Sequence, residues 1–154
     1  FMFSYERAAK YYAINRASFS GATFSGGWSE RASYARFTDS SVQRLRDFKA
    51  KNFRVDYADF QDAMEYHPNA FLYLDPPYML EGSQNSLYGI DGNLHSSFDR
   101  DRLHGLLTKR SGWVMSYNDC AEIRKMYKDY EIIEAEWSYG MNKSKQSSEI
   151  LIKG

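Results

Sequence analysis

Residues 71–78, which read Phe-Leu-Tyr-Leu-Asp-Pro-Pro-Tyr, constrain the fold more than any other stretch. The four apolar and aromatic residues at its start predict a short buried strand. This strand must end at Asp75, because neither proline can donate a ladder hydrogen bond and Pro77 keeps Pro76 out of helical backbone angles. A carboxylate and an aromatic ring, Tyr78, are therefore fixed where a strand ends. In an open α/β sheet, ligands bind at the carboxyl ends of the strands.

The composition predicts one packed domain in the cytoplasm. The chain has 154 residues, enough for a real core, and 17% of them are aromatic. No apolar run is long enough to cross a bilayer, and no signal peptide is visible at the start of the chain. Cys120 is the only cysteine, and the three histidines show no ligand spacing. We therefore expect no disulfide and no metal.

Charge is unevenly distributed along the chain. Residues 1–54 contain ten Lys/Arg and four Asp/Glu, a net charge of +6, and the remaining 10 basic and 16 acidic residues give −6. A basic part beside an acidic part is typical of a polyanion-binding face joined to another function. A chance asymmetry on solvated helices is equally compatible with the charges alone.

The basic part is predicted to contain two helices around an irregular segment. Apolar spacing predicts an amphipathic helix at 5–16, and Asp39 or Ser40 begins a second helix that runs to about Lys51. Between them, residues 18–34 read as a loop or an irregular hairpin. Arg31 and the nearby Arg36 alternate there with aromatic residues, namely Phe24, Trp28, Tyr34 and Phe37. Such a mixture suits contacts with phosphates and bases, although the aromatic rings could instead tuck into the core.

The acidic part is predicted to alternate strands and helices. The predicted elements are a strand at 53–57, a short helix at 58–64, the strand at 71–74, a lid-like loop at 79–98, a helix capped by Asp99, a strand at 113–117, a helix begun by Asp119, and two closing strands at 131–137 and 149–152. This order gives an α/β sheet that has flanking helices and finishes in an antiparallel hairpin.

Several of these segments together resemble one enzyme family, the Dam-like adenine-N6 DNA methyltransferases of the alpha motif order. The matching segments are residues 8–16 and 19–21, the Asp-Phe pair at 59–60, the Asp-Pro-Pro-Tyr motif at 75–78, and residues 98–107, 116–119 and 149–152. The resemblance implies a partial Rossmann-like methyltransferase sheet over residues 1–154, with a target-recognition hairpin inserted at 17–38. It also implies transfer of a methyl group from S-adenosylmethionine to N6 of adenine in double-stranded DNA.

The resemblance assigns roles to individual residues. The catalytic motif is Asp75, Pro76, Pro77 and Tyr78, and the residues expected at the cofactor are Asp59, Phe60 and Asp75. The residues expected to contact DNA are Asn15, Arg16, Arg31, Arg36, Lys143 and Lys145. The chemistry agrees with these roles, because a carboxylate and a carbonyl at a rigid turn can accept the two N–H groups of an adenine amine, and a Tyr ring can stack on the base.

One part of the family pattern is missing. The family's first strand, which ends in a glycine-rich turn around the methionine part of the cofactor, has no counterpart here, and Gly26-Gly27 does not follow a strand. We therefore expect a fragment of the enzyme, with uncovered sheet edges that favour self-association. The residues leave three alternatives open: adenine N6 in RNA, cytosine N4 in DNA, and a non-catalytic DNA-binding remnant.

Overall fold

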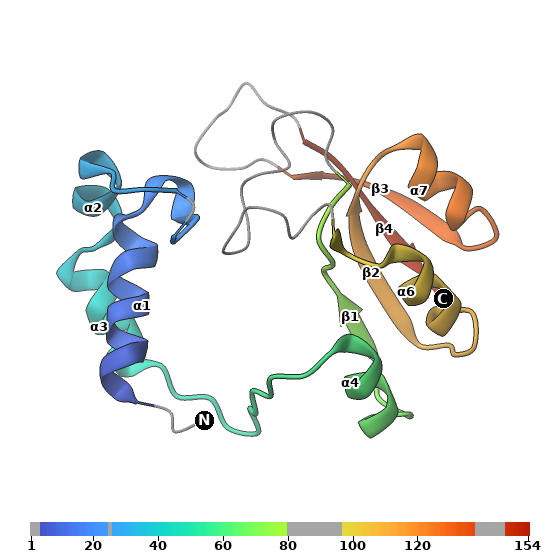
Figure 1. Cartoon of the computed structure of the whole chain (residues 1–154), viewed down its shortest axis with the longest axis horizontal. Coiled ribbons are helices and arrows are strands. Elements are labelled where there is room, and N and C mark those ends of the chain that lie inside the picture. The colour runs from blue at the N-terminus through green and yellow to red at the C-terminus, as the bar shows by residue number, and fades with distance from the viewer. Residues whose placement is uncertain (1–3, 25, 80–96, 138–146) are drawn as a thin grey trace. The chain divides into compact units, whose positions relative to one another are not determined.

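The computed structural model describes residues 4–24, 26–79, 97–137 and 147–154, and it divides the chain into two compact units (Figure 1). The first unit comprises residues 1–55 and 81–96, and the second comprises residues 56–80 and 97–154. The segment predicted as the target-recognition hairpin, 17–38, belongs to the first unit. The Asp-Pro-Pro-Tyr motif belongs to the second.

The first unit is helical in its described part. Its elements are α1 (Tyr5–Ala17), the 3-10 helix η1 (Phe19–Gly21), α2 (Glu30–Arg36) and α3 (Asp39–Asp47). A hydroxyl caps the start of each α-helix: Ser4, Ser29 and Thr38 each accept a hydrogen bond from the backbone N–H three residues further on. Such caps satisfy backbone donors that have no partner within the helix, so each helix begins where its sequence provides a hydroxyl.

The segment between α1 and α2 doubles back as an irregular hairpin, as predicted. Ser18 and Trp28 form an antiparallel bridge, and the N–H of Phe19 donates to the carbonyl of Gly27 over 3.0 Å. The prediction of a loop as far as residue 34 is wrong, because residues 30–36 form α2. Ser29 followed by Glu30 is a helix-start signal, which the surrounding Gly and Ser residues obscured in the sequence.

The predicted apolar helix faces of the first unit are not buried within it. No residue of α1 is buried, and Tyr5, one of the residues that suggested an amphipathic helix, is 96% exposed. The helix predicted at 39–51 ends at Asp47, and Leu45 and Phe48 remain exposed. The buried residues in the described part of this unit are small: Ser18, Ala22 and Ser41. Helical spacing was thus sufficient to predict helices but not the surface that each one covers.

Residues 53–57, predicted as a strand, are not in a strand. The alternating apolar residues Phe53, Val55 and Tyr57 are all exposed. Alternation produces a strand only where a neighbouring edge and a face to bury are present, and this segment pairs with no strand in the described part of the chain.

The second unit is a mixed α/β structure. Its elements are α4 (Phe60–Tyr66), β1 (Leu72–Leu74), α6 (Arg100–Leu107), β2 (Trp113–Asn118), α7 (Ala121–Met126), β3 (Glu131–Trp137) and β4 (Ser147–Lys153). The sheet order is β1-β2-β4-β3. β1 and β2 are parallel, whereas β4 pairs antiparallel with both β2 and β3. The predicted α/β class and the closing antiparallel pair are therefore confirmed.

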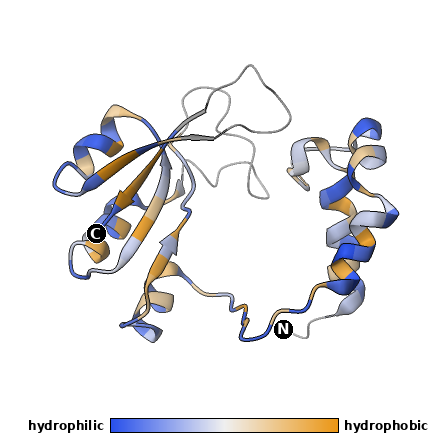
Figure 2. Ribbon diagram, turned by 180° about the vertical axis from the view of Figure 1, so that it is seen from behind, coloured by the Kyte–Doolittle hydropathy of each residue, from blue (hydrophilic) through white to orange (hydrophobic). Residues whose placement is uncertain are grey.

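The core of this unit lies on one face of the sheet, where helices α6 and α7 cover β2 and β4. Figure 2 shows hydrophobic residues concentrated along these strands. The buried cluster consists of Met64, Leu103, Leu107, Trp113, Met115, Tyr117, Ile123, Tyr127, Ile150 and Ile152. β1 stands at the edge of the described sheet, and the prediction of a buried strand is wrong: Leu72 and Leu74 are half-buried and Tyr73 is 67% exposed.

The two predicted helix starts of this unit have different outcomes. Asp99 caps α6 by accepting a hydrogen bond from the N–H of Arg102 over 3.0 Å, as expected. Asp119 does not cap α7: the cap position is Cys120, which makes no side-chain bond. The Asp119 carboxylate instead accepts two hydrogen bonds from Arg124, at 2.6 and 2.9 Å. A bidentate charged pair holds this carboxylate more firmly than a single backbone N–H would.

Candidate active site

The Asp-Pro-Pro-Tyr turn begins where β1 ends. Leu74 is paired with Met115 in the parallel register, so the turn leaves β1 beside the last residues of β2. Asp75 is exposed, and Tyr78 is half-buried. The turn contains two prolines, which lack the N–H groups needed to continue the backbone ladder, and side chains of β2 hold it instead.

The carboxylate of Asp75 is held by a buried hydroxyl. Ser116 Oγ donates to Asp75 Oδ1 over 3.1 Å and lies 3.4 Å from the carbonyl oxygen of Leu74. The hydroxyl of Tyr73 in turn donates to Ser116 Oγ over 3.2 Å. Ser116 is only 5% exposed, so water has little access to its end of this bond. A charged acceptor and a buried donor make a strong hydrogen bond, which restricts the rotation of the Asp75 side chain.

The second half of the turn is held by Tyr117. The hydroxyl of Tyr117 donates to the carbonyl oxygen of Pro77 over 2.9 Å and accepts from Arg100 Nε over 3.0 Å. Its ring stacks against Tyr78, with centroids 5.5 Å apart and an interplanar angle of 29°. Burial raises the pKa of Tyr117 above its usual value, against the opposing effect of the Arg100 hydrogen bond. The hydroxyl therefore stays protonated and able to donate at neutral pH.

The end of the turn is held by the side-chain amide of Asn118, which makes the hydrogen bonds that a neighbouring strand would make. Asn118 Oδ1 accepts from the N–H of Met79 over 3.0 Å, and Asn118 Nδ2 donates to the carbonyl of Met79 over 2.8 Å. This pair satisfies both backbone groups of one residue in the same way as a strand ladder. The three last residues of β2 thus hold residues 75, 77 and 79 in succession.

Two hydrogen-bond acceptors in the turn stay available. Among the described residues, none donates a hydrogen bond to Asp75 Oδ2 or to the carbonyl oxygen of Pro76. Their neighbours are occupied, since Ser116 takes Asp75 Oδ1 and Tyr117 takes the Pro77 carbonyl. The arrangement can therefore accept two hydrogen bonds from an external donor.

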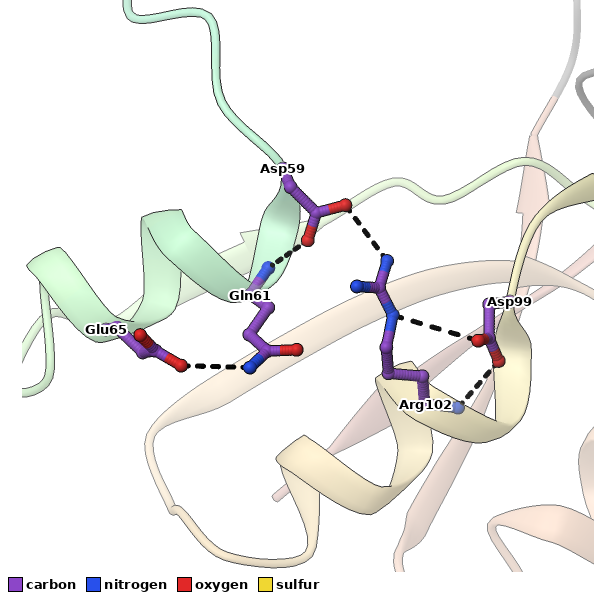
Figure 3. A network of polar contacts seen from close by, with 5 residues as sticks. All are labelled: Asp59, Gln61, Glu65, Asp99 and Arg102. Carbon is purple, nitrogen blue, oxygen red and sulfur yellow. Dashed lines mark hydrogen bonds and ion pairs between the residues drawn. The ribbon is translucent and has the colours of Figure 1, made fainter.

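The predicted cofactor residues Asp59 and Phe60 lie at the start of α4. Figure 3 shows the polar contacts of Asp59. Asp59 Oδ1 accepts from the N–H of Gln61 over 2.9 Å, and Oδ2 accepts from Arg102 Nη2 over 2.9 Å. The Arg102 guanidinium also lies over the Phe60 ring, 4.2 Å from its centroid, and the Phe98 ring is 5.5 Å from the same ring. An aromatic surface and a carboxylate are therefore adjacent, with a cation between them.

The Asp59 carboxylate is kept ionised by its neighbours. The hydrogen bond from the Gln61 N–H, and then that from Arg102, lower the pKa of Asp59 below its usual value. An ionised, solvent-exposed carboxylate can accept hydrogen bonds from hydroxyl or amino groups of a ligand.

In the first unit, two of the residues predicted to contact DNA have a structural role. Asn15 Nδ2 donates to the carbonyl of Gly21 over 2.9 Å, and Arg36 donates to the carbonyl of Ser18. Arg16 lies over the Tyr12 ring, with its guanidinium carbon 5.3 Å from the centroid. The bonds of Asn15 and Arg36 fix the geometry of the hairpin between α1 and α2, whereas the Arg16 contact lies within α1.

Arg31 has a different environment, because it is exposed and makes no ion pair or hydrogen bond to another described residue. The aromatic rings near it do not tuck into a core, since the exposed residues include Phe24, Trp28, Tyr34 and Phe37. Trp28 also borders an open apolar pocket of about 380 Å³ together with α1. The exposed rings and Arg31 therefore fit the predicted contact surface. Lys143 and Lys145 lie outside the described residues.

Sequence reasoning assigned no role to the side chains that support the turn: Ser116, Tyr117, Asn118 and Arg100. The signal was present in the polar residues that end the apolar strand at 113–117. The role of these polar residues can be recognised only once the parallel register of β1 and β2 is known. In the described part of the chain, no three His, Cys, Asp or Glu side chains gather as a metal site.

Comparison with known proteins matches most of the chain to a family model. The family model described as D12 class N6 adenine-specific DNA methyltransferase matches residues 2–141. No curated protein matches the chain significantly. The matched range includes the Asp-Pro-Pro-Tyr turn, the supporting end of β2 and the hairpin of the first unit. No helix in the described ranges has the length and apolarity to span a membrane.

Proposed function

Because the chain belongs to the D12 class N6 adenine-specific DNA methyltransferase family, we propose that Asp75, Pro76 and Tyr78 form its adenine-binding catalytic turn. The family reaction is the transfer of a methyl group from S-adenosylmethionine to N6 of adenine in DNA. One observation supports the assignment most directly: Asp75 Oδ2 and the Pro76 carbonyl are available on a turn whose other groups are held. Two acceptors match the two N–H groups of an adenine amine.

The proposed chemistry follows from the weakness of N6 as a nucleophile. Its lone pair is delocalised into the purine ring, so the nitrogen must become pyramidal before it can attack. Asp75 accepts a hydrogen bond from one N–H and the Pro76 carbonyl accepts from the other, and both bonds strengthen as N6 gains positive charge. The proton lost from N6 leaves to solvent after the methyl group is transferred. Neither a metal ion nor a covalent intermediate is needed.

The base must leave the duplex to reach this turn, at a cost of a few kcal/mol. Tyr78 offsets part of this cost by stacking on the extruded base, and base–aromatic stacking contributes about 1–3 kcal/mol per base. Stacking on Tyr117 holds the Tyr78 ring in place, with the ring centroids 5.5 Å apart. Pro77 keeps the ring and the carboxylate in a fixed relation, which is the preorganisation that the reaction needs.

Asp59 and Phe60, with Asp75, are the residues proposed to hold S-adenosylmethionine, which supplies the electrophilic methyl group when bound. The groups present fit a nucleoside, because an ionised carboxylate can accept from hydroxyl and amino groups and a phenyl ring can stack on a purine. Arg102 lies on the Phe60 ring and donates to Asp59. The position of its guanidinium, over the ring and beside the carboxylate, is therefore one that suits a flat group with hydrogen-bond donors.

The proposed DNA partner is a duplex, contacted by exposed residues of the first unit such as Arg31 and by Asn15, Arg16, Arg36, Lys143 and Lys145 as predicted. Self-association through the edge of β1 is proposed on the exposure of Tyr73 and Phe71, since an uncovered edge strand invites pairing. The cytoplasmic setting is proposed on the free thiol of Cys120.

The test is methyl transfer by full-length protein carrying Asp75→Asn or Asp75→Ala, measured as N6-methyladenine in digested DNA. Both variants should lose activity by a factor of at least about 100, as when a transition-state acceptor is removed, while their melting temperature stays near that of the parent. Asp129→Asn, another exposed aspartate of the same unit, is the matched control and should retain activity. Turnover near the parental rate in Asp75→Ala would remove Asp75 from the mechanism.

A further inference from the structure

The last three residues of β2 make a pattern that the catalytic assignment does not by itself require. Ser116, Tyr117 and Asn118 are consecutive, and each uses its side chain to bond a different residue of the turn. The turn advances two residues, from 75 to 77 to 79, for each single step along β2. A backbone ladder would advance one residue for one. Side chains of β2 therefore hold the turn where the prolines interrupt the backbone ladder.

Burial makes these bonds difficult to replace. Ser116 is 5% exposed and Tyr117 is 1% exposed, so water cannot readily substitute for either hydroxyl once it is removed. Loss of the Ser116 hydroxyl frees the Asp75 carboxylate to rotate. Loss of the Tyr117 hydroxyl leaves the Pro77 carbonyl and Arg100 Nε without their shared partner. Without that hydrogen bond the Pro77 carbonyl is no longer fixed, so the turn can shift toward solvent or another donor.

We propose that the carboxyl end of β2, Ser116-Tyr117-Asn118, is the positioning element of the active site, in which the Ser116 hydroxyl orients the Asp75 carboxylate and the Tyr117 hydroxyl fixes the Pro77-Tyr78 peptide. The inference rests on the proposed roles of Asp75 and Tyr78. These three residues touch neither DNA nor the methyl donor in this scheme. They act on the reaction through the geometry of the acceptors, and a displacement of about 1 Å at such a site can cost about 100-fold in rate.

The experiment compares Ser116→Ala and Tyr117→Phe with Tyr127→Phe in full-length protein, by steady-state kinetics on DNA and by thermal melting. Tyr127 is the matched control because it is 2% exposed in the same core and, among the described residues, its hydroxyl makes no hydrogen bond with the turn. Its ring packs instead on Trp113. We expect kcat to fall by about 10- to 100-fold in Ser116→Ala and Tyr117→Phe, with KM for DNA and for S-adenosylmethionine changed by less than about twofold. Tyr127→Phe should keep the parental kcat.

The outcomes separate this inference from the proposed function. If Asp75→Asn is inactive while Ser116→Ala and Tyr117→Phe retain the parental kcat, the positioning role is wrong and the catalytic role of Asp75 stands. If Asp75→Asn is active, the proposed function fails, and the positioning role fails with it. If Tyr127→Phe loses kcat as strongly as Tyr117→Phe, the effect belongs to the core in general, and the inference is overturned.

Discussion

The stacking role of Tyr78 leads to a quantitative prediction. Tyr78→Ala removes the ring on which the extruded base is proposed to lie, whereas Tyr78→Phe keeps the ring and removes the hydroxyl. Stacking of a base on an aromatic side chain contributes about 1–3 kcal/mol. Because about 1.4 kcal/mol corresponds to a factor of ten, kcat/KM should fall by about 5- to 150-fold in Tyr78→Ala. Tyr78→Phe should stay within about threefold of the parent.

The same substitution affects stability, and this effect must be separated from catalysis. The Tyr78 and Tyr117 rings are 5.5 Å apart, and such aromatic pairs contribute about 0.5–1.5 kcal/mol beyond their buried area. Tyr78→Ala should therefore lower the melting temperature by a few degrees. Kinetics must be measured well below the melting temperature of the variant, so that the folded fraction is the same in all samples.

The assay is transfer of a labelled methyl group to DNA at subsaturating DNA concentration, with melting followed by circular dichroism. Two results would refute the reasoning. One is a Tyr78→Ala variant whose kcat/KM is within about twofold of the parent, because then no stacking energy is lost. The other is a Tyr78→Phe variant as impaired as Tyr78→Ala, because then the hydroxyl and not the ring surface would be responsible.

Three further predictions concern charged residues. Arg31→Ala should reduce the slope of log affinity for DNA against log salt concentration by about one, as expected for one lost phosphate contact, and an unchanged slope would contradict that role. Arg36→Ala should instead lower the melting temperature, because it removes the bond to the Ser18 carbonyl. The hydrogen bond from Arg124 lowers the pKa of Asp119 below its usual 3.8, so its stabilising effect is present above pH 3.8 and is lost as the pH falls through the lower folded value. The difference in melting temperature between the parent and Arg124→Gln should therefore narrow below pH 3.8, and a difference that is constant with pH would contradict the assignment.

The parts of the fold that could be predicted are those where one local signal is decisive. The two prolines after Leu74 end β1, and Asp99 caps α6 as predicted. The cap of α3 is Thr38, next to the predicted Asp39 or Ser40. Each of these signals operates through groups a few residues apart, so the sequence contains both partners. The family resemblance rested on the same local motifs, and the family match confirms it.

Two of the wrong predictions concern features that depend on a partner that the local pattern does not include. The alternation at 53–57 satisfies the rule for a strand, but no neighbouring strand in the described residues pairs with it. Asp119 satisfies the rule for a helix cap, but the guanidinium of Arg124 competes for the same carboxylate. A local pattern predicts the element that its residues favour, and a stronger charged partner elsewhere changes the outcome.

In the hydrogen-bonded network of the candidate site, too, some residues can be recognised from a local motif and others only from a distant partner. Asp75 and Tyr78 are recognisable because the prolines between them fix the turn locally. The supporting residues of β2 are 41 residues further along the chain, as the separation of Asp75 and Ser116 shows, and ordinary polar residues at a strand end have many possible roles. Once Leu74 is paired with Met115, however, Ser116 must follow beside Asp75, because parallel strands advance together. The strand register therefore identifies Ser116, which the sequence alone does not single out, as the residue that holds the proposed catalytic carboxylate. The kinetics of Ser116→Ala test that inference directly.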